Sequence, residues 1–252
     1  MRCENKTMVR LPNYLSRLLV LVLLLTSLSA CVWLRLLELK NQLANFDENI
    51  TTESSDHFTL VFKNPVLIND DFVTLAKLQP TSKQQTPTGS RWIQAFHKID
   101  VKGNLQPGID FFFTLEFDQE DRLTRWDFSK LFMTMVPAQF FEDSIRSLAK
   151  GKVDETNHRF KVDPKDRAKI LVKPPTLQQI KDAMGEPVDT GKDDGKNVYV
   201  YRFLVDSPWI DPDYQDRRIT DVYLYFEPKT NELTRMGGRF IGLKININLV
   251  KD

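Results

Sequence analysis

The sequence predicts an α+β protein in which two tandem helix-plus-antiparallel-sheet repeats follow an N-terminal signal segment and a short helix. Three observations support this fold class. Segments with helical periodicity alternate with aromatic and β-branched strand segments. The order of these segments recurs at offsets of 107 to 110 residues. The composition, with 17 Phe and only 10 Gly in 252 residues, is typical of a packed globular protein.

Each predicted repeat contains one helical segment followed by strand segments. Leu123-Thr124-Arg125 of the first matches Leu233-Thr234-Arg235 of the second, and Pro80 matches Pro187. The matching segments are 69–80, 91–99 and 111–128 in the first repeat, and 176–187, 197–205 and 221–240 in the second. A tandem duplication is the simplest interpretation of this constant spacing.

The second repeat has the clearer boundaries. Thr176 is a suitable helix N-cap, and Gly185 stands where a left-handed residue ends a helix, with Pro187 preventing its continuation. The segment NVYVYRFLV is rich in β-branched and aromatic residues, which favours a strand. DVYLYFE predicts another strand, and residues 228–231 predict the turn that follows it.

In the first repeat, two predicted strands flank a turn at residues 119–121. Pro137 then begins a helix whose other end is marked by Gly151, the usual placement of these two residues. Residues 45–57 are polar and predict a linker. The predicted domain plan is therefore signal peptide 1–30, N-terminal region with helix and linker 31–57, first repeat 58–160 and second repeat 161–252.

The N-terminus has the features of an exported protein. A basic segment is followed by the aliphatic run Leu18–Leu25 and then by small residues, which is typical of a secretory signal. The basic residues are Arg2, Lys6, Arg10 and Arg17.

Leu28-Ser29-Ala30-Cys31 resembles a bacterial lipobox, which identifies the chain as similar to lipoproteins. That resemblance implies cleavage between Ala30 and Cys31 and a covalent lipid on the Cys31 sulfur. Because Cys3 would be removed with the signal, Cys31 would be the lone cysteine of the mature chain, and a lone thiol in an exported protein calls for an explanation. Residue 32 is Val rather than Asp, and by the same resemblance the expected location is the periplasmic face of the outer membrane.

An uncleaved inner-membrane helix is the alternative. Leu18 to Leu34 is a stretch of 17 uncharged residues, at the lower limit of spanning length. The helical pattern continues beyond it, since Val32, Leu36, Leu39 and Leu43 share one face. This apolar face could either lie on the bilayer surface or pack against the folded body.

TLQQIKDAMGEP, the Tyr-rich strand after it and VYLYFEPKTNELTR together resemble the SmpA/OmlA-like family, which includes a lipoprotein subunit of the outer-membrane β-barrel assembly machinery. The paired arrangement also resembles that of the β-lactamase-inhibitor proteins. The resemblance covers about 70 residues of the second repeat well and the first loosely. It implies a non-catalytic module that binds through its sheet.

No catalytic or metal-binding pattern is evident. His57, His97 and His158 have no second His or Cys at metal-ligand spacing, and there is no G-x-S-x-G sequence. With 35 Lys and Arg against 34 Asp and Glu, the chain lacks the basic character of a nucleic-acid-binding protein. We therefore expect no enzyme activity, metal, small-molecule substrate or nucleic-acid partner, and no cofactor beyond the lipid on Cys31.

The segment 206–221 is the candidate partner-binding loop. Trp209 and Tyr214 stand near Arg217 and Arg218, and these residue types are enriched at protein interfaces. A solvated connection between strands and a calcium site are the alternatives. The calcium ligands would be the nearby Asp211, Asp213 and Asp216, but the spacing lacks the Gly and Glu of an EF-hand loop.

The function predicted from the sequence is a membrane-anchored, periplasm-facing lipoprotein that binds or scaffolds another protein of the cell envelope. An envelope hydrolase with dispersed acidic residues is one alternative. A periplasmic enzyme inhibitor is another, suggested by the paired repeats.

Overall fold

The computed structural model describes residues 32–148, 152–154, 159–161 and 173–249. In chain order the helical elements are residues 32–44, α2 (Phe46–Asn49), α3 (Asn69–Ala76), α4 (Lys130–Met135), α5 (Ala138–Leu148), α6 (Leu177–Met184) and the 3-10 helix η2 (Pro212–Arg218). The strands are β1 (Ile50–Ser54), β2 (Phe58–Phe62), β3 (Ser82–Thr86), β4 (Gly89–Ile99), β5 (Leu105–Phe117), β6 (Leu123–Phe128), β7 (Lys152–Asp154), β8 (Arg159–Lys161), β9 (Asp189–Asp193), β10 (Lys196–Asp206), β11 (Ile219–Phe226), β12 (Leu233–Phe240) and β13 (Leu243–Asn248).

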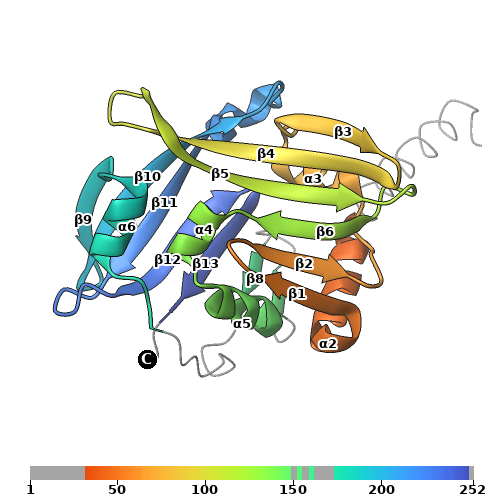
Figure 1. Ribbon diagram of the computed structural model, residues 1–252, viewed down its shortest axis with the longest axis horizontal. Helices are drawn as coiled ribbons and strands as arrows, with labels where there is room; N and C mark the ends of the chain where they lie inside the picture. Colours follow the sequence, from red (N-terminus) through yellow and green to blue (C-terminus); the bar gives the residue numbers. More distant parts are fainter. Residues whose placement is uncertain (1–31, 149–151, 155–158, 162–172, 250–252) are drawn as a thin grey trace, which may run out of the picture.

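Eleven of these strands form one antiparallel sheet that curls into a half-barrel (Figure 1). Its order is β1-β2-β6-β5-β4-β10-β11-β12-β13, with β3 also pairing with β4 and β9 with β10. The two remaining strands, β7 and β8, form a separate two-stranded antiparallel sheet. Each long central strand, β4 and β10, therefore has three partners along its length.

The predicted fold class, two tandem helix-plus-sheet repeats, is wrong. The strands of the two halves belong to one continuous sheet, because β4 pairs with β10 through five Cα partners from Arg202↔Ile99 to Asp206↔Ala95. If the two halves formed separate sheets, β4 and β10 would each leave a row of unpaired backbone N–H and C=O groups at a sheet edge. Their pairing with one another satisfies the groups of both strands. Periodicity along the chain predicts strands but carries no information on which distant edge each one will pair with.

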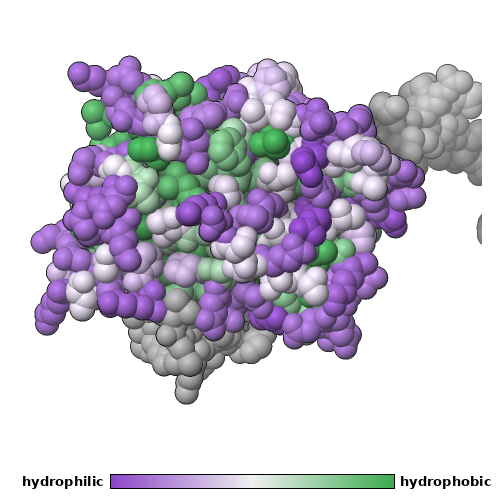
Figure 2. Space-filling view, viewed as in Figure 1, coloured by the Kyte–Doolittle hydropathy of each residue, from purple (hydrophilic) through white to green (hydrophobic). Residues whose placement is uncertain are grey.

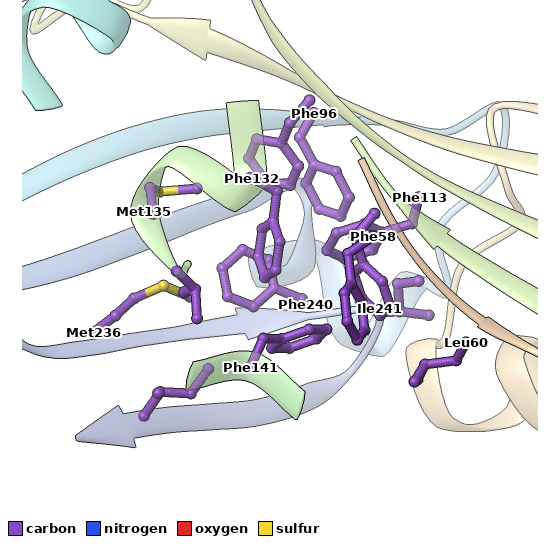
Figure 3. Close-up of a cluster of buried hydrophobic side chains, with 14 of the residues drawn as sticks. Phe58, Leu60, Phe96, Phe113, Phe132, Met135, Phe141, Met236, Phe240 and Ile241 are labelled. Atoms are coloured by element: carbon purple, nitrogen blue, oxygen red, sulfur yellow. The ribbon is translucent and has the colours of Figure 1, made fainter. Parts of the chain in front are cut away.

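The inner and outer faces of the half-barrel differ from each other in composition, because successive side chains of a strand point to opposite faces. The inner face of β5 carries Phe111 and Phe113, while Phe112 points to the outer face. Helix α4 lies between β5 and β12, and its Phe132 ring is 5.0 Å from that of Phe113 and 5.5 Å from that of Phe240 (Figures 1 and 3). The inside of the half-barrel is thus filled by aromatic side chains.

Helix 32–44 docks on the folded body. The four residues that share one face all turn inward: Val32, Leu36 and Leu43 are buried, and Leu39 packs against the core. Arg35 binds the buried Asp71 carboxylate with two hydrogen bonds, 2.7 Å from Nε and 2.5 Å from Nη2. Of the two alternatives, the apolar face of this helix therefore packs against the folded body.

Several locally predicted features are confirmed. Thr176 caps α6 by accepting a hydrogen bond from the Gln179 N–H, and Gly185 ends the helix with a φ of 67°. Pro137 immediately precedes α5. Residues 45–57, in contrast, are not a linker: they form α2 and β1, and β1 pairs with β2 at one edge of the sheet. Their polar composition reflects the exposed side of an edge strand.

Candidate partner-binding surface

The loop between β10 and β11 is attached to the end of α3. The Gln79 N–H donates to the Trp209 carbonyl over 3.0 Å, and the Asp211 N–H donates to the Lys77 carbonyl over 2.9 Å. Leu78 and Ile210 form an isolated β-bridge between the same two segments. The loop backbone is therefore fixed, although the Trp209 side chain is 48% exposed.

The four candidate residues of this loop have different surroundings. Trp209 and Arg218 are exposed. Two cations lie near the Tyr214 ring, with Arg217 Cζ 4.5 Å and Lys77 Nζ 5.7 Å from its centroid. Arg217 is half-buried and turned toward α3. Trp209 and Arg218 are thus the members of this group that a partner could contact without rearrangement.

Arg217 caps the C-terminus of α3. Its Nη1 donates to the carbonyls of Leu75, at 2.5 Å, and Ala76, at 2.7 Å. Carbonyls at the end of a helix lack partners within the helix and carry partial negative charge, which a guanidinium satisfies. Burial is the main cause that lowers the pKa of Arg217, and the neighbouring Arg239 lowers it further.

Gly242 contacts α3 at the same place. A Cβ at this position would lie 2.2 Å from the Leu75 carbonyl oxygen, and the φ of Gly242 is 76°. The end of α3 is therefore held between the β10–β11 loop and the β12–β13 turn, and only glycine fits at this contact.

A second buried cation holds the end of α6. Lys98 lies on the inner face of β4, and its Nζ donates to the carbonyls of Met184, at 2.5 Å, and Glu186, at 2.7 Å. The Tyr201 hydroxyl donates to the Gly185 carbonyl over 3.3 Å. Burial lowers the pKa of Lys98 and raises the pKa of Tyr201.

These two caps connect the halves of the chain reciprocally. Arg217, from the C-terminal half, binds the end of α3 in the N-terminal half, and Lys98, from the N-terminal half, binds the end of α6 in the C-terminal half. Together with the β4–β10 pairing, they make the body a single unit. A surface built on this scaffold is presented with fixed geometry.

The outer face of the central strands carries a charged cluster. His97 Nδ1 is 2.8 Å from Asp110 Oδ1, and its Nε2 is 3.7 Å from Asp206 Oδ2. One strand further, Arg202 binds Asp221 through two hydrogen bonds of 2.6 and 2.9 Å. These groups come from β4, β5, β10 and β11, so they cross the seam between the two halves.

Exposed apolar side chains flank this cluster on the same face. They are Phe112 on β5 and, on β11, Ile219 and Tyr223. Ile219 is the cross-strand partner of Leu204, which in turn is the partner of His97. Aromatic side chains such as Phe112 and Tyr223 belong to the types enriched at protein interfaces, whereas charged residues like those of the cluster are depleted at interface cores.

Asp211 and Asp216, two of the acidic residues of the loop, each bind a different partner. Asp211 Oδ1 accepts from the Asp213 N–H over 3.1 Å, and Asp216 pairs with Arg239 over 3.0 Å. Within the parts of the chain that the structure describes, no group of three or more His, Cys, Asp or Glu side chains is placed to hold a metal ion.

The cavity beside the loop is small. It has a volume of about 10 Å³, close to the space of one water molecule, and its lining includes Phe96, Arg217 and Ile241. A larger depression of about 410 Å³ opens on the surface beside Phe46 and Arg146, where the guanidinium lies 3.9 Å from the ring centroid. Arg146 is bound there by Asp47 and Glu142.

Sequence reasoning missed the buried charged residues Asp71 and Lys98 and the half-buried Arg35, which binds Asp71. A signal existed for Lys98, because it continues the alternation of Trp92, Gln94 and Phe96 on the inward face of β4. A lysine in the inward register of an apolar strand requires a buried partner. Neither Arg35 nor Asp71 stands in a pattern that predicts its partner.

The predicted lipidation residue Cys31 and the cleavage position after Ala30 lie outside the described residues. Among the residues described, no helix is both long enough and apolar enough to cross a bilayer. No family model, curated protein or solved structure matches this chain.

Proposed function

We propose that the protein is a lipoprotein of the outer membrane that faces the periplasm and binds or scaffolds another envelope protein. In this proposal Cys31 carries the lipid, and the surface around Trp209 meets the partner. The observation that carries the proposal is the packing of the helix that begins at Val32, one residue after Cys31.

The packing matters because of where it would place the body. Val32 and Leu36 are buried against the core, and Arg35 is fixed by Asp71. An anchor on Cys31 would therefore attach to a rigid part of the fold rather than to a flexible tether. A binding surface at a defined distance from the membrane suits a scaffold, because it restricts the partners that can reach it.

Substitution of Cys31 by Ser tests the anchor. We expect Cys31→Ser to abolish acyl labelling and to leave the precursor uncut, because a hydroxyl is a far poorer nucleophile than a thiolate for receiving the lipid. Metabolic labelling with a fatty-acid analogue and mass spectrometry of the N-terminus measure both effects. Normal processing of this variant would contradict the lipoprotein proposal, and Cys3→Ser is the matched control that should change nothing.

Substitution of Trp209 by Ala tests the partner surface. Truncation of an exposed aromatic anchor typically costs at least about 2 kcal/mol of binding energy, so we expect Trp209→Ala to lose most of the bound partner. The measurement is capture of the tagged protein from crosslinked envelopes, followed by mass spectrometry against the wild type.

Lys130→Ala is a control, since Lys130 is 76% exposed in a different region. Recovery of the same protein by both variants would exclude Trp209 from the interface. Recovery of no protein other than the bait by the wild type would contradict the scaffold proposal.

A further inference from the structure

The outward face of helix 32–44 changes character along its length. Leu34 is 64% exposed and Leu37 is partly exposed. Trp33 is half-buried and lies between this face and the core, against which it partly packs. Beyond them the exposed residues Glu38 and Asn41 are polar, and Ala44 is small. The apolar part of this face is therefore confined to the first two turns, at the end adjacent to Cys31.

Leu34 and Leu37 cannot turn inward, whereas Trp33 already packs partly against the core. The opposite face is occupied by Val32 and Leu36 against the core, and the paired hydrogen bonds of Arg35 to Asp71 fix the rotation of the helix about its axis. At 100° per residue, Leu34 then points directly away from the body. The fold thus holds an exposed leucine in place beside a half-buried tryptophan.

The chain itself indicates what covers this surface. The uncharged stretch that begins at Leu18 runs without interruption into the helix. If Cys31 carries acyl chains, or if residues 18–34 stay uncleaved in the membrane, hydrocarbon lies at this end of the helix. Tryptophan and tyrosine are both enriched at the boundary between hydrocarbon and water.

We infer that Trp33, Leu34 and Leu37 form a bilayer-contact surface, which seats the body directly on the membrane in one orientation. The inference rests on the proposed membrane attachment and adds to it the face that touches lipid. The lipid retains the protein at the membrane, and this surface determines how the body is turned.

This orientation has a consequence for the far end of the sheet. Arg35 binds Asp71 near the start of α3, and the Asn69 N–H donates to the Asp121 carbonyl, so the β5–β6 turn lies near the bilayer. Strand β5 is 13 residues long, so its opposite end is roughly 40 Å away along the strand. There the β4–β5 hairpin exposes Val101 and Leu105. Figure 2 shows hydrophobic surface, in green, at the upper left, where Figure 1 places this hairpin.

Quenching of tryptophan fluorescence by brominated lipid tests the inference. The full-length protein is purified from membranes and reconstituted into vesicles of phosphatidylethanolamine and phosphatidylglycerol with brominated acyl chains. Quenching requires close contact with the hydrocarbon region. We expect Trp33→Phe to lose most of the quenching and Trp209→Phe to retain it, although Trp209 has 48% of its surface exposed. Unchanged quenching in Trp33→Phe, or none in the wild type, would overturn the inference.

A second pair of variants keeps the test independent of packing around Trp33. Leu34→Glu adds a charge at an exposed position, so the fold should persist while the quenching of Trp33 falls. Val101→Glu adds the same charge at the 70% exposed hairpin tip and should leave the quenching unchanged. Equal quenching in Leu34→Glu and the wild type would also refute the contact.

The bilayer-contact surface and the lipid anchor of the proposed function can be tested separately. Mass spectrometry of the same preparation reports whether Cys31 carries lipid, and flotation reports whether the protein is attached to vesicles. A protein that is acylated and floats, but whose Trp33 is not quenched, retains its anchor and lacks the bilayer-contact surface.

Discussion

Substitution of Phe111 by Ala is expected to lower the free energy of unfolding by about 3–5 kcal/mol, the usual range for removing a large aromatic side chain from a packed core. Phe111 is 0% exposed. Its ring stacks on Phe96 at 4.4 Å between centroids and meets Phe203 edge-on at 4.8 Å. Because Phe96 belongs to β4 and Phe203 to β10, the cavity left by the mutation would open at the junction of the two halves.

The neighbouring residue provides the control. Phe112 has the same side chain on the same strand but is 38% exposed on the outer face, so Phe112→Ala should cost less than about 1 kcal/mol. Urea unfolding of both variants, with similar slopes in denaturant, measures the difference. Since a shift of one residue in strand register exchanges the two faces, equal losses in the two variants would contradict the register described for β5.

Substitution of Arg35 by Met is expected to be the other strongly destabilising change, by about 3–5 kcal/mol, because it leaves a buried carboxylate without its cation. The Asp71 side chain is 1% exposed. It also accepts a hydrogen bond of 2.9 Å from the Ile68 N–H at the start of α3. Methionine retains the apolar stem of arginine, so the loss reports mainly on the charge.

Two further variants define the cause of that loss. The additional substitution Asp71→Asn removes the buried charge and leaves an acceptor for the Ile68 N–H, so the double variant should recover part of the stability. Arg91→Met is the matched control, because Arg91 binds Glu116 at 2.6 Å with both side chains partly exposed. An exposed pair contributes about 0–1 kcal/mol. A similar loss in Arg91→Met and Arg35→Met would show that burial of the Asp71 pair is not the cause.

The Arg35–Asp71 pair also connects stability with the proposed function. It fixes the helix that follows Cys31 on the body, so its loss should increase proteolysis within residues 32–44 before the sheet unfolds. A protein anchored through that helix would then be held by a flexible segment. Its partner-binding surface would no longer have a fixed distance from the membrane.

Features with local causes could be predicted from the sequence. The Thr176 N-cap and the Gly185 terminus of α6 depend on residues within one turn of the helix, and both are present. Strand segments such as 197–205 were recognisable from their composition, and β10 contains that segment. The predicted signal segment and the lipobox resemblance around Cys31 also rest on short contiguous stretches, and both stay predictions.

Only the tertiary structure decided how these elements combine. The pairing of β4 with β10 joins strands about 100 residues apart in the sequence. Any two antiparallel edge strands form the same backbone hydrogen bonds, so these bonds do not specify which strands pair. The caps by Lys98 and Arg217 likewise depend on carbonyls 86 and 142 residues away. Periodicity and capping record the conformation of each segment, whereas partner choice depends on how the apolar faces are buried together, which is a property of the whole chain.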